Sequence, residues 1–348
     1  MLPSLRALCE PDARHPCLLG RAPWSPRQPA AADRRSLGFR RSPAPRAVPR
    51  VLPAGPGVCV GNLVAGGAGK TPVALAMTSH FAARGLPVHV VTRGYGGRLG
   101  GPVRVDPARH DAAAVGDEAL LLAARGPCWV ARDRSAGVRA AIAAGAGMVL
   151  LDDGFQNPTI AKTLSLVVVD AAYGFGNGRV IPAGPLRESL ARGLGRANAL
   201  VLLGTEAEAR RAQWIKIGRG LPILPAVLAP IGGDRLAGSR FLAFAGIGRP
   251  EKFFATLREL GAVLVGTRAF PDHHPYRITE IEQLLRGAER AQARLVTTAK
   301  DIVRMPPARR AEIEVLEVEI RWANPATLCG FIKPVVLSAL GNGRNPAN

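Results

Sequence analysis

The chain has 348 residues, of which 47% are hydrophobic, so it can bury a large core and is long enough for two domains. Its net charge of +20 comes mainly from arginine, since only six of its 46 basic residues are lysine. The arginines are scattered and aromatic residues make up only 5% of the chain, whereas nucleic-acid-binding proteins gather basic residues on one element with aromatics between them. We therefore expect no nucleic-acid partner. A basic surface is still compatible with other anionic partners, and among these the motifs described below favour an anionic membrane face.

The cysteines and the hydropathy of the chain give information about its redox environment and about membrane segments. The five cysteines, at positions 9, 17, 59, 128 and 329, form no CxxC pair and no Cys/His cluster with metal-ligand spacing. They predict reduced, mostly buried thiols in a cytoplasmic protein. The chain has no run of about 18 apolar residues, so we expect no membrane-spanning helix, and its first residues lack the apolar core of a secretion signal.

From Gly57 onward, apolar runs of strand length alternate with segments of helical period. Such alternation predicts an α/β fold with a mostly parallel sheet flanked by helices, which binds ligands beyond the carboxyl ends of its strands. A second set of elements begins near Phe241 and predicts a smaller α/β lobe, so we expect domains at 57–236 and 237–348 with a cleft between them. The expected strands are GVCV, PVHVVT, PCWV, MVLLDD, SLVVVD, ALVLLG and PILPAV, then FLAFAGIG, AVLVG, RLVTT and EVLEVE, with helices near 70–84, 116–126, 133–145, 206–218, 250–260, 277–290 and 325–339.

The segment GNLVAGGAGKTP, residues 61–72, follows the first apolar run directly and predicts the phosphate-binding loop of a P-loop NTPase-like core. Its glycines let backbone N–H groups converge on polyphosphate oxygens, while Lys70 adds a positive charge and Thr71 a hydroxyl ligand for Mg²⁺. The common motif GxxxxGK[ST] has glycine where this chain has Val64, so the loop is of a less common type, and a purely structural turn is the alternative. The predicted nucleotide contacts are Gly66, Gly67, Ala68, Gly69, Lys70, Thr71 and Pro72.

The run MVLLDDGFQ, residues 148–156, ends an apolar strand in two carboxylates, Asp152 and Asp153. Carboxylates at the carboxyl end of a strand can hold Mg²⁺ opposite the hydroxyl of Thr71. An Asp pair before a glycine also occurs in structural turns, but the GKT upstream favours a metal site.

Three further clusters lie on predicted loops. RGYGG follows a predicted strand, so its polar side chains emerge at the ligand edge of the sheet. VGDE places two acids at a helix start, where capping of free N–H groups is an alternative role. PAGPLRE lies at another helix start, where a surface ion pair is the alternative. The side chains concerned are Arg93 and Tyr95, Asp117 and Glu118, and Arg187 and Glu188.

Taken in order, these motifs resemble those of one family, tetraacyldisaccharide 4'-kinase, the lipid A 4'-kinase of Gram-negative envelopes. The resemblance covers roughly residues 57 to 330 and rests on GNLVAGGAGKTP, RGYGG, VGDE, DDGFQ, PAGPLRE, AGIGRPEKFF, FPDHHPY and TTAKD. It implies transfer of phosphate from ATP, with Mg²⁺, to the 4'-hydroxyl of a tetraacyldisaccharide 1-phosphate lipid. It also implies a peripheral location at the cytoplasmic face of the bacterial inner membrane.

The resemblance implies roles for individual residues as well. Asp117, the acid of VGD, would act with His273, the histidine directly after aspartate in FPDHHPY, as the base for the sugar hydroxyl; the adjacent His274 is the weaker candidate. A histidine oriented by a carboxylate can accept the proton of an alcohol as it attacks phosphorus. Lys70 would neutralise charge between the β- and γ-phosphates. The implied metal ligands are Thr71, one of Asp152 and Asp153 and, more weakly, Glu188, and the implied substrate contacts are Arg93, Tyr95, Glu118, Gln156 and Arg187.

The chain departs from the family pattern at two places. Family members usually begin with an apolar or amphipathic segment that docks on the membrane, whereas residues 1–56 carry eleven prolines and ten arginines against three acids. We expect this arm to be disordered or loosely attached. The arm could bind anionic lipid through its charge. The abrupt change of composition at Gly57 instead favours the hypothesis that residues 1–56 come from a misread coding region. Detection of peptides from residues 1–50 in the natively expressed protein would exclude that hypothesis. TTAKD has Ala299 where the family often has glutamate.

Two other classes of function remain as alternatives. A nucleotide-driven switch or assembly ATPase would share the loop and the Asp-ended strand, but it would need no base in the second lobe. A basic nucleic-acid-binding module, suggested by the charge alone, would bind DNA or RNA with strong salt dependence. The scattered arginines argue against that module. The oligomeric state is left open by the sequence.

Overall fold

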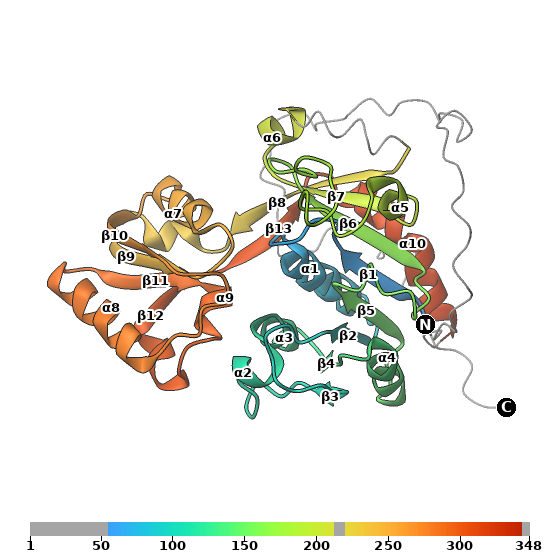
Figure 1. The fold of residues 1–348 in the computed structure, drawn as a ribbon, viewed down its shortest axis with the longest axis horizontal. Helices are drawn as coiled ribbons and strands as arrows, with labels where there is room; N and C mark the ends of the chain where they lie inside the picture. Colours follow the sequence, from blue (N-terminus) through green and yellow to red (C-terminus); the bar gives the residue numbers. More distant parts are fainter. Residues whose placement is uncertain (1–54, 212–219, 343–348) are drawn as a thin grey trace. The chain divides into compact units, whose positions relative to one another are not determined.

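A computed structural model of the chain describes residues 55–211 and 220–342. These residues divide into two compact units, drawn in Figure 1. The Pro- and Arg-rich arm expected over residues 1–56 lies outside the described residues except at its last two positions. The helix expected at 206–218 is described only as far as Arg211. The first unit contains described residues up to Val91, then Arg134–Leu228 and those from Ile320 onward; the second contains Thr92–Asp133 and Ala229–Glu319.

This division differs from the single boundary expected between residues 236 and 237. The chain passes to the second unit after Val91, returns at Arg134, leaves again after Leu228 and returns at Ile320. Periodicity in a sequence identifies the elements, but the unit in which an element packs depends on contacts between residues far apart in the chain. The segment that carries VGDE therefore belongs with the second unit rather than with the phosphate loop.

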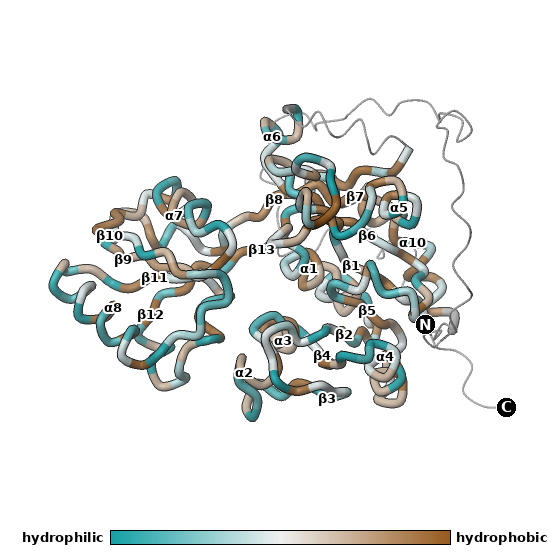
Figure 2. Tube along the Cα trace, viewed as in Figure 1, coloured by the Kyte–Doolittle hydropathy of each residue, from teal (hydrophilic) through white to brown (hydrophobic). Residues whose placement is uncertain are grey.

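The larger sheet has nine strands in the order β13-β8-β7-β6-β1-β5-β2-β4-β3. The pairs from β8 through β7, β6, β1 and β5 to β2 are parallel, and the pair β3–β4 is antiparallel. The strands β1, β5, β6 and β7 are buried along nearly their whole length, as a covered parallel sheet requires. Figure 2 shows brown, hydrophobic chain around β7. The expected mostly parallel α/β sheet is confirmed. Its strands are β1 (Gly57–Gly61), β2 (Val88–Thr92), β3 (Val103–Arg104), β4 (Cys128–Val130), β5 (Met148–Asp152), β6 (Leu164–Asp170), β7 (Ala199–Leu203), β8 (Ile223–Pro230) and β13 (Val318–Trp322).

The helix α1 (Lys70–Ala82) begins immediately after the glycine-rich loop and packs against β1 and β5. Val73, Met77 and Phe81 are fully buried and lie four residues apart, so they form one apolar face along the helix. This face fixes the amino end of α1 beside the carboxyl end of β1. The other helices of the first unit are α4 (Arg134–Ala143), α5 (Leu190–Leu194), α6 (Glu206–Arg211) and α10 (Pro325–Asn342).

The register of β1 and β5 brings the two phosphate-site motifs to the same edge of the sheet. Val60 of β1 is paired with Asp152 of β5, and the backbone N–H of Asp153 donates to the carbonyl of Val60 at 2.9 Å. Because the strands are parallel, the glycine-rich loop and the Asp pair leave the sheet side by side.

The second unit contains a smaller, fully parallel sheet in the order β10-β9-β11-β12. Side chains alternate along β9: Phe241, Ala243 and Ala245 pack in one cluster with α7, whereas Phe244 packs in another with α8. The two helices therefore cover opposite faces, as Figure 1 shows, and the expected smaller α/β lobe is confirmed. Its elements are β9 (Arg240–Ala245), α7 (Pro250–Glu259), β10 (Val263–Ala269), α8 (Ile278–Arg290), β11 (Arg294–Thr298), α9 (Ala299–Ile302) and β12 (Ile313–Leu316), with α2 (Ala112–Val115), α3 (Asp117–Ala123), η2 (Gly233–Leu236) and η3 (Pro307–Glu312).

The run EVLEVE, predicted as one strand of the smaller lobe, is divided between the two sheets. β12 ends at Leu316 in the smaller sheet, and β13 begins at Val318 in the larger one. Leu316 and Ile320 are both buried, each in its own sheet. The prediction of a single strand was wrong, because an alternating apolar pattern does not specify the sheet to which each half belongs. The helix α10 that follows lies in the first unit.

Candidate active site

In the first unit, the glycine-rich loop ends in a helix start suited to binding an anion. Gly69 adopts the left-handed conformation at φ 79° and caps α1, and a Cβ there would meet Leu203 at 2.4 Å. Lys70 and Thr71 occupy the first turn and are largely buried. The free N–H groups and the positive end of the helix dipole favour phosphate at this position.

Asp153 lies among the basic side chains of this region. Its carboxylate accepts from Arg187 Nη1 at 2.8 and 3.1 Å, and Lys70 Nζ lies 3.8 Å from Oδ2. Its backbone adopts φ 52°, a conformation that non-glycine residues rarely hold outside functional sites and turns. The neighbouring Asp152 is 1% exposed, and Arg134 donates to the carbonyls of both aspartates.

The segment PAGPLRE braces the phosphate loop along its backbone. Ala65 N–H donates to the Pro185 carbonyl, and Arg187 N–H donates to the Leu63 carbonyl, both at 2.8 Å. A bridge pairs Val64 with Leu186 between these two bonds. Val64, the residue that departs from the common motif, is thus part of a two-stranded contact.

Gln156 and Glu188, expected at the substrate and the metal, support the loop in this structure. Gln156 Nε2 donates to the Asn62 carbonyl at 2.9 Å and to Glu188 Oε1 at 3.2 Å. Both oxygens of Glu188 accept from Arg196, at 2.7 and 2.8 Å. These hydrogen bonds use much of the accepting capacity of the Glu188 carboxylate. Asn62, which sequence reasoning missed, is fully buried and donates to the Val64 carbonyl.

The donor set of the first unit fits Mg²⁺ held together with a nucleotide. Within the described residues, no group of three His, Cys, Asp or Glu side chains is arranged to hold a metal ion without further ligands. Mg²⁺ prefers oxygen ligands and usually takes one or two carboxylates with water and substrate phosphates. The hydroxyl of Thr71 and the carboxylates of Asp152 and Asp153 are donors of this kind.

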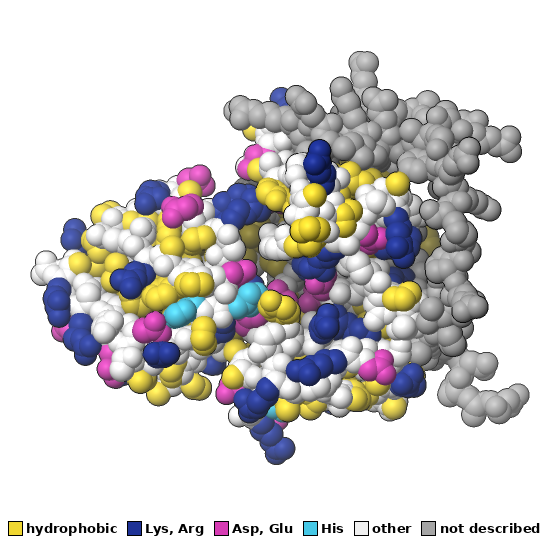
Figure 3. Space-filling view, in the orientation of Figure 1, with side chains coloured by type: hydrophobic (Ala, Val, Ile, Leu, Met, Phe, Trp, Pro, Cys, Tyr) yellow, Lys and Arg dark blue, Asp and Glu magenta, His cyan; other side chains and the backbone are white. Residues whose placement is uncertain are grey.

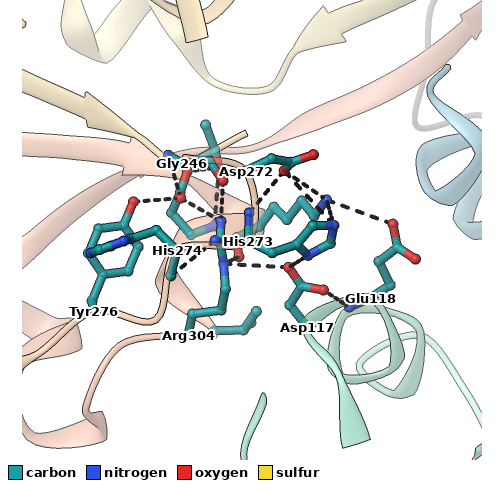
Figure 4. Close-up of polar contacts among 12 residues, drawn as sticks. Asp117, Glu118, Gly246, Asp272, His273, His274, Tyr276 and Arg304 are labelled. Carbon is teal, nitrogen blue, oxygen red and sulfur yellow. Dashed lines mark hydrogen bonds and ion pairs between the residues drawn. The ribbon is translucent and has the colours of Figure 1, made fainter. Parts of the chain in front are cut away.

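In the second unit, His273 and Asp117 form the pair that the motifs implied. His273 Nδ1 lies 2.9 Å from Asp117 Oδ2, and the other oxygen of Asp117 accepts from the backbone N–H of Glu118 at 2.8 Å (Figure 4). Arg304 Nε lies 3.4 Å from Oδ2. Burial works against ionisation of Asp117, but the hydrogen bond from His273 and the charges of Lys300 and Arg304 outweigh it and hold the pKa of Asp117 below its ordinary value.

Asp117 and Lys300 favour the same tautomer of His273 from opposite sides of its ring. Lys300 Nζ lies 3.2 Å from His273 Nε2 and within 3.8 Å of carboxylate oxygens of Asp272 and Glu118. An ammonium group can only donate, so Nε2 is the accepting nitrogen and Nδ1 carries the hydrogen that is donated to Asp117. The lone pair that a general base needs is therefore on Nε2.

Lys300 was not identified from the sequence as a site residue, although the rarity of lysine in this chain could have drawn attention to it. The chain has six lysines among 46 basic residues, and two of them, Lys70 and Lys300, lie at the two groups of polar residues described here. A compact, flexible ammonium is not equivalent to a planar guanidinium, so a lysine kept in an arginine-rich chain is itself informative.

Arg304, also missed, belongs to a buried network that holds the histidine loop. Asp301 is fully buried and accepts from Gly246 N–H, Tyr276 Oη and Arg304 Nη2 at 2.6 to 2.8 Å. Arg304 also donates to the carbonyls of His274 and Gly246. The network lies beyond the carboxyl ends of β9, β10 and β11, where parallel sheets place their ligands.

His273 and His274 have different surroundings. His273 holds φ 59° and lies with its ring 5.3 Å from that of Tyr95, which is 67% exposed. His274 stacks on Phe270 at 4.7 Å and pairs with Glu280 at the start of α8. The structure thus brings His273, and not His274, to Asp117.

The predicted residues fall into two sets, one in each unit. Lys70, Thr71, Asp152, Asp153 and Arg187 gather at the phosphate loop, and Asp117, Glu118, Tyr95 and His273 gather in the second unit. Arg93 is exposed at the end of β2.

None of the helices in the described segments is long and apolar enough to cross a bilayer. Within the described residues, Cys59, Cys128 and Cys329 are buried, as expected, and none of them is in a disulfide. Burial raises the pKa of the Cys59 thiol to about 12.

Replacing Asp117 by asparagine tests the electrostatics of the pair. Because the pKa of Asp117 is lowered in the folded state, its contribution to stability is present above its ordinary pKa and is lost as the pH falls through the lowered value. We expect Asp117→Asn to lower the free energy of unfolding by on the order of 1–3 kcal/mol at neutral pH. In urea unfolding, the difference from wild type should shrink below about pH 4. A difference that is constant with pH would contradict this account.

The chain is similar to known proteins over most of its length. The family model described as tetraacyldisaccharide-1-P 4'-kinase matches residues 35–336, so the match begins within the Pro- and Arg-rich segment. A tetraacyldisaccharide 4'-kinase of Rhodospirillum centenum is 54% identical over 310 residues, 88% of each chain, and that of Dinoroseobacter shibae is 55% identical over 302 residues, 86% of this chain and 87% of the relative.

A solved structure shares the fold. LpxK from Aquifex aeolicus, crystallised in complex with ATP, superposes with a TM-score of 0.66 at 23% identity and covers 83% of this chain and 91% of that chain. The identity and the coverage of the curated relatives, together with the family match over most of the sequence, lead to one assignment. The chain belongs to the tetraacyldisaccharide-1-P 4'-kinase family.

Proposed function

We propose that the chain transfers the γ-phosphoryl group of ATP to the 4'-hydroxyl of a tetraacyldisaccharide 1-phosphate in lipid A biosynthesis. It would act with Mg²⁺ as a peripheral protein at the cytoplasmic face of the bacterial inner membrane. Family membership supports the reaction, and the ATP complex of the solved LpxK supports the phosphate donor.

The first unit would bind ATP. The start of α1 and the Lys70 ammonium would hold the β- and γ-phosphates, so Lys70 would exchange its contact with Asp153 for phosphate oxygens. Thr71 with Asp152 or Asp153 would supply the oxygen ligands of Mg²⁺, which neutralises phosphate charge when bound. Arg187, 2.8 Å from Asp153, would keep that carboxylate in place and offer a second cation to the phosphoryl group.

The second unit would supply the base. His273 Nε2 would accept the proton of the 4'-hydroxyl as its oxygen bonds to the γ-phosphorus and the bond to the β-phosphate oxygen breaks, giving ADP and the phosphorylated lipid. Asp117 would stabilise the resulting imidazolium, which would then release its proton to water. Tyr95, exposed beside His273, offers an aromatic face to the sugar ring, and Arg93 and Glu118 are candidates for its polar groups.

Lys300 would act as a positioning residue. In this structure its ammonium donates a hydrogen bond to His273 Nε2, the atom that would accept the proton of the substrate. Lys300 would therefore have to move away from Nε2 when the substrate hydroxyl binds there. The carboxylates of Glu118 and Asp272, at 3.8 and 3.6 Å, offer Lys300 a place to remain nearby. From there it would favour the approach of an anionic substrate and keep the reactive tautomer of His273.

The observation that carries the proposal is the 2.9 Å contact between His273 and a buried carboxylate. A nucleotide-driven switch has no need of an imidazole oriented in this way, and the family match does not favour that alternative. A kinase that activates an alcohol can use one as its base.

Labelled ATP tests the function directly. We expect purified full-length protein with γ-labelled ATP, Mg²⁺ and tetraacyldisaccharide 1-phosphate to place label on the sugar. His273→Gln should lower kcat/KM by about 10²- to 10⁴-fold while ATP binding is kept, because only the proton acceptor is removed. Lys70→Met should weaken both ATP binding and transfer. Hydrolysis of ATP without labelled lipid would contradict the proposal and favour the switch.

A matched pair of substitutions tests the role of Lys300. Lys300→Met removes the charge at similar length, and Lys300→Arg keeps it. We expect Lys300→Met to lower kcat by at least about tenfold through loss of the aligned tautomer, and Lys300→Arg to recover part of that loss. Nitrogen chemical shifts of labelled His273 should show a smaller share of the Nδ1–H tautomer in Lys300→Met than in wild type or Lys300→Arg, although Asp117 still favours that tautomer. An unchanged spectrum together with unchanged kcat would exclude the positioning role.

A further inference from the structure

The loop between β6 and α5 exposes a continuous run of apolar residues. Residues 180–183, Val-Ile-Pro-Ala, are all exposed, with Val180 at 39% and Ile181 at 54%, and Tyr173 in the same loop is 49% exposed. Figure 3 shows hydrophobic side chains on the face where Figure 1 draws this loop. We call residues 180–183 together with Tyr173 the apolar tip. Four successive exposed apolar residues are unfavourable in water, so such a run calls for a function.

The apolar tip is held in place by the backbone of its own loop. Ile181 N–H donates to the Leu186 carbonyl at 2.9 Å, and Leu186 N–H donates to the Arg179 carbonyl at 3.0 Å. Val180 also pairs with Leu186, whose side chain is fully buried. A buried leucine thus anchors one side of the turn while Val180 and Ile181 project from the other. The exposure of the tip is a feature of an ordered turn.

The same turn is joined to the phosphate loop. Pro185 accepts from Ala65 N–H, and Leu186 bridges to Val64, next to the glycines that would hold ATP. One residue later, Arg187 reaches Asp153. The apolar tip is therefore tied to the end of the sheet at which phosphate would be transferred. A lipid that offers its hydroxyl there brings its acyl chains to the same end.

The charge around the apolar tip suits an anionic lipid surface. No acidic residue occurs from Ala171 to Arg187, and Arg179 is exposed beside Val180. Asp170, just before the loop, accepts from the backbone N–H groups of Ala172 and Tyr173. Apolar side chains flanked by arginine, with a tyrosine nearby, are the composition of protein segments that enter the boundary between lipid headgroups and acyl chains.

We propose that the apolar tip inserts into the anionic bilayer that contains the lipid substrate. The inference rests on the proposed function, since that function requires a membrane-resident substrate. Val180, Ile181 and Tyr173 would enter the acyl boundary, and Arg179 would meet lipid phosphates. The connection through Pro185 and Leu186 would then hold the phosphate loop close to the membrane surface.

Vesicle flotation of the full-length protein tests the proposal. The variant Val180→Ser/Ile181→Ser should bind mixed phosphatidylethanolamine and phosphatidylglycerol vesicles at least about tenfold more weakly than wild type, because two aliphatic side chains leave the lipid. The loss should persist at high salt, which screens any attachment by arginine alone. Leu337→Ser on α10, 44% exposed in wild type, is the control and should bind as wild type does. Equal binding by the double variant and the control would overturn the proposal.

A reporter variant tests insertion independently of affinity. In Ile181→Trp, the new indole should be quenched by vesicles with brominated acyl chains, beyond the quenching of the four native tryptophans in wild type. Vesicle binding without this added quenching would mean that another part of the chain holds the membrane, and the proposal would fall.

Kinetics separate this proposal from the function on which it rests. With the lipid substrate dissolved in detergent, the double variant should keep the wild-type rate of phosphate transfer. With the same lipid in vesicles, its KM should rise by about tenfold at unchanged kcat. Loss of transfer in detergent as well would contradict the membrane role, while absence of transfer by wild type in either form would contradict the proposed function instead.

Discussion

The hydrogen bond between His273 and the buried carboxylate of Asp117 is the interaction on which the proposed chemistry depends. A sugar hydroxyl is a poor nucleophile, and a histidine becomes an effective base when a carboxylate fixes its tautomer and stabilises its charged form. Arg304 and the N–H of Glu118 hold the carboxylate, and Lys300 defines the opposite side of the imidazole. His273 and Lys300 follow the carboxyl ends of β10 and β11 in the small parallel sheet, and the start of α3 brings Asp117 and Glu118 to them.

In the first unit, too, the predicted site residues lie at the carboxyl ends of parallel strands, but they suit a different ligand. The parallel pairing of β1 with β5 brings a helix start and two carboxylates together, which suits a polyphosphate and a cation. Asp153 and His273 are two of the three non-glycine residues with positive φ in the described chain, and each lies at one of these strand-end sites. Strain of this kind persists where the surroundings impose it, and it makes both places candidates for a functional role.

Much of this could be predicted from the sequence because the signals are local. Apolar runs indicated the strands, and GKT, DDGFQ, VGDE and DHH indicated the polar side chains that lie together at the two strand-end sites. Local signals could not predict how segments far apart in the chain pack together. EVLEVE is divided between two sheets, and residues 92–133 belong with the second unit. Arg304 and Lys300 were missed because their importance comes from partners about 180 residues away along the chain, in the VGDE segment. Gln156 and Glu188 brace a loop, a role that composition does not distinguish from ligand binding.

Chemical rescue is the most direct test of the central claim that His273 removes the proton from the sugar hydroxyl. His273→Gly leaves a space for an added base of the same chemistry. The account predicts that this variant transfers almost no label to the lipid by itself and that added imidazole restores transfer, increasingly as the neutral fraction of imidazole rises with pH. Transfer at the wild-type rate without imidazole would contradict the account.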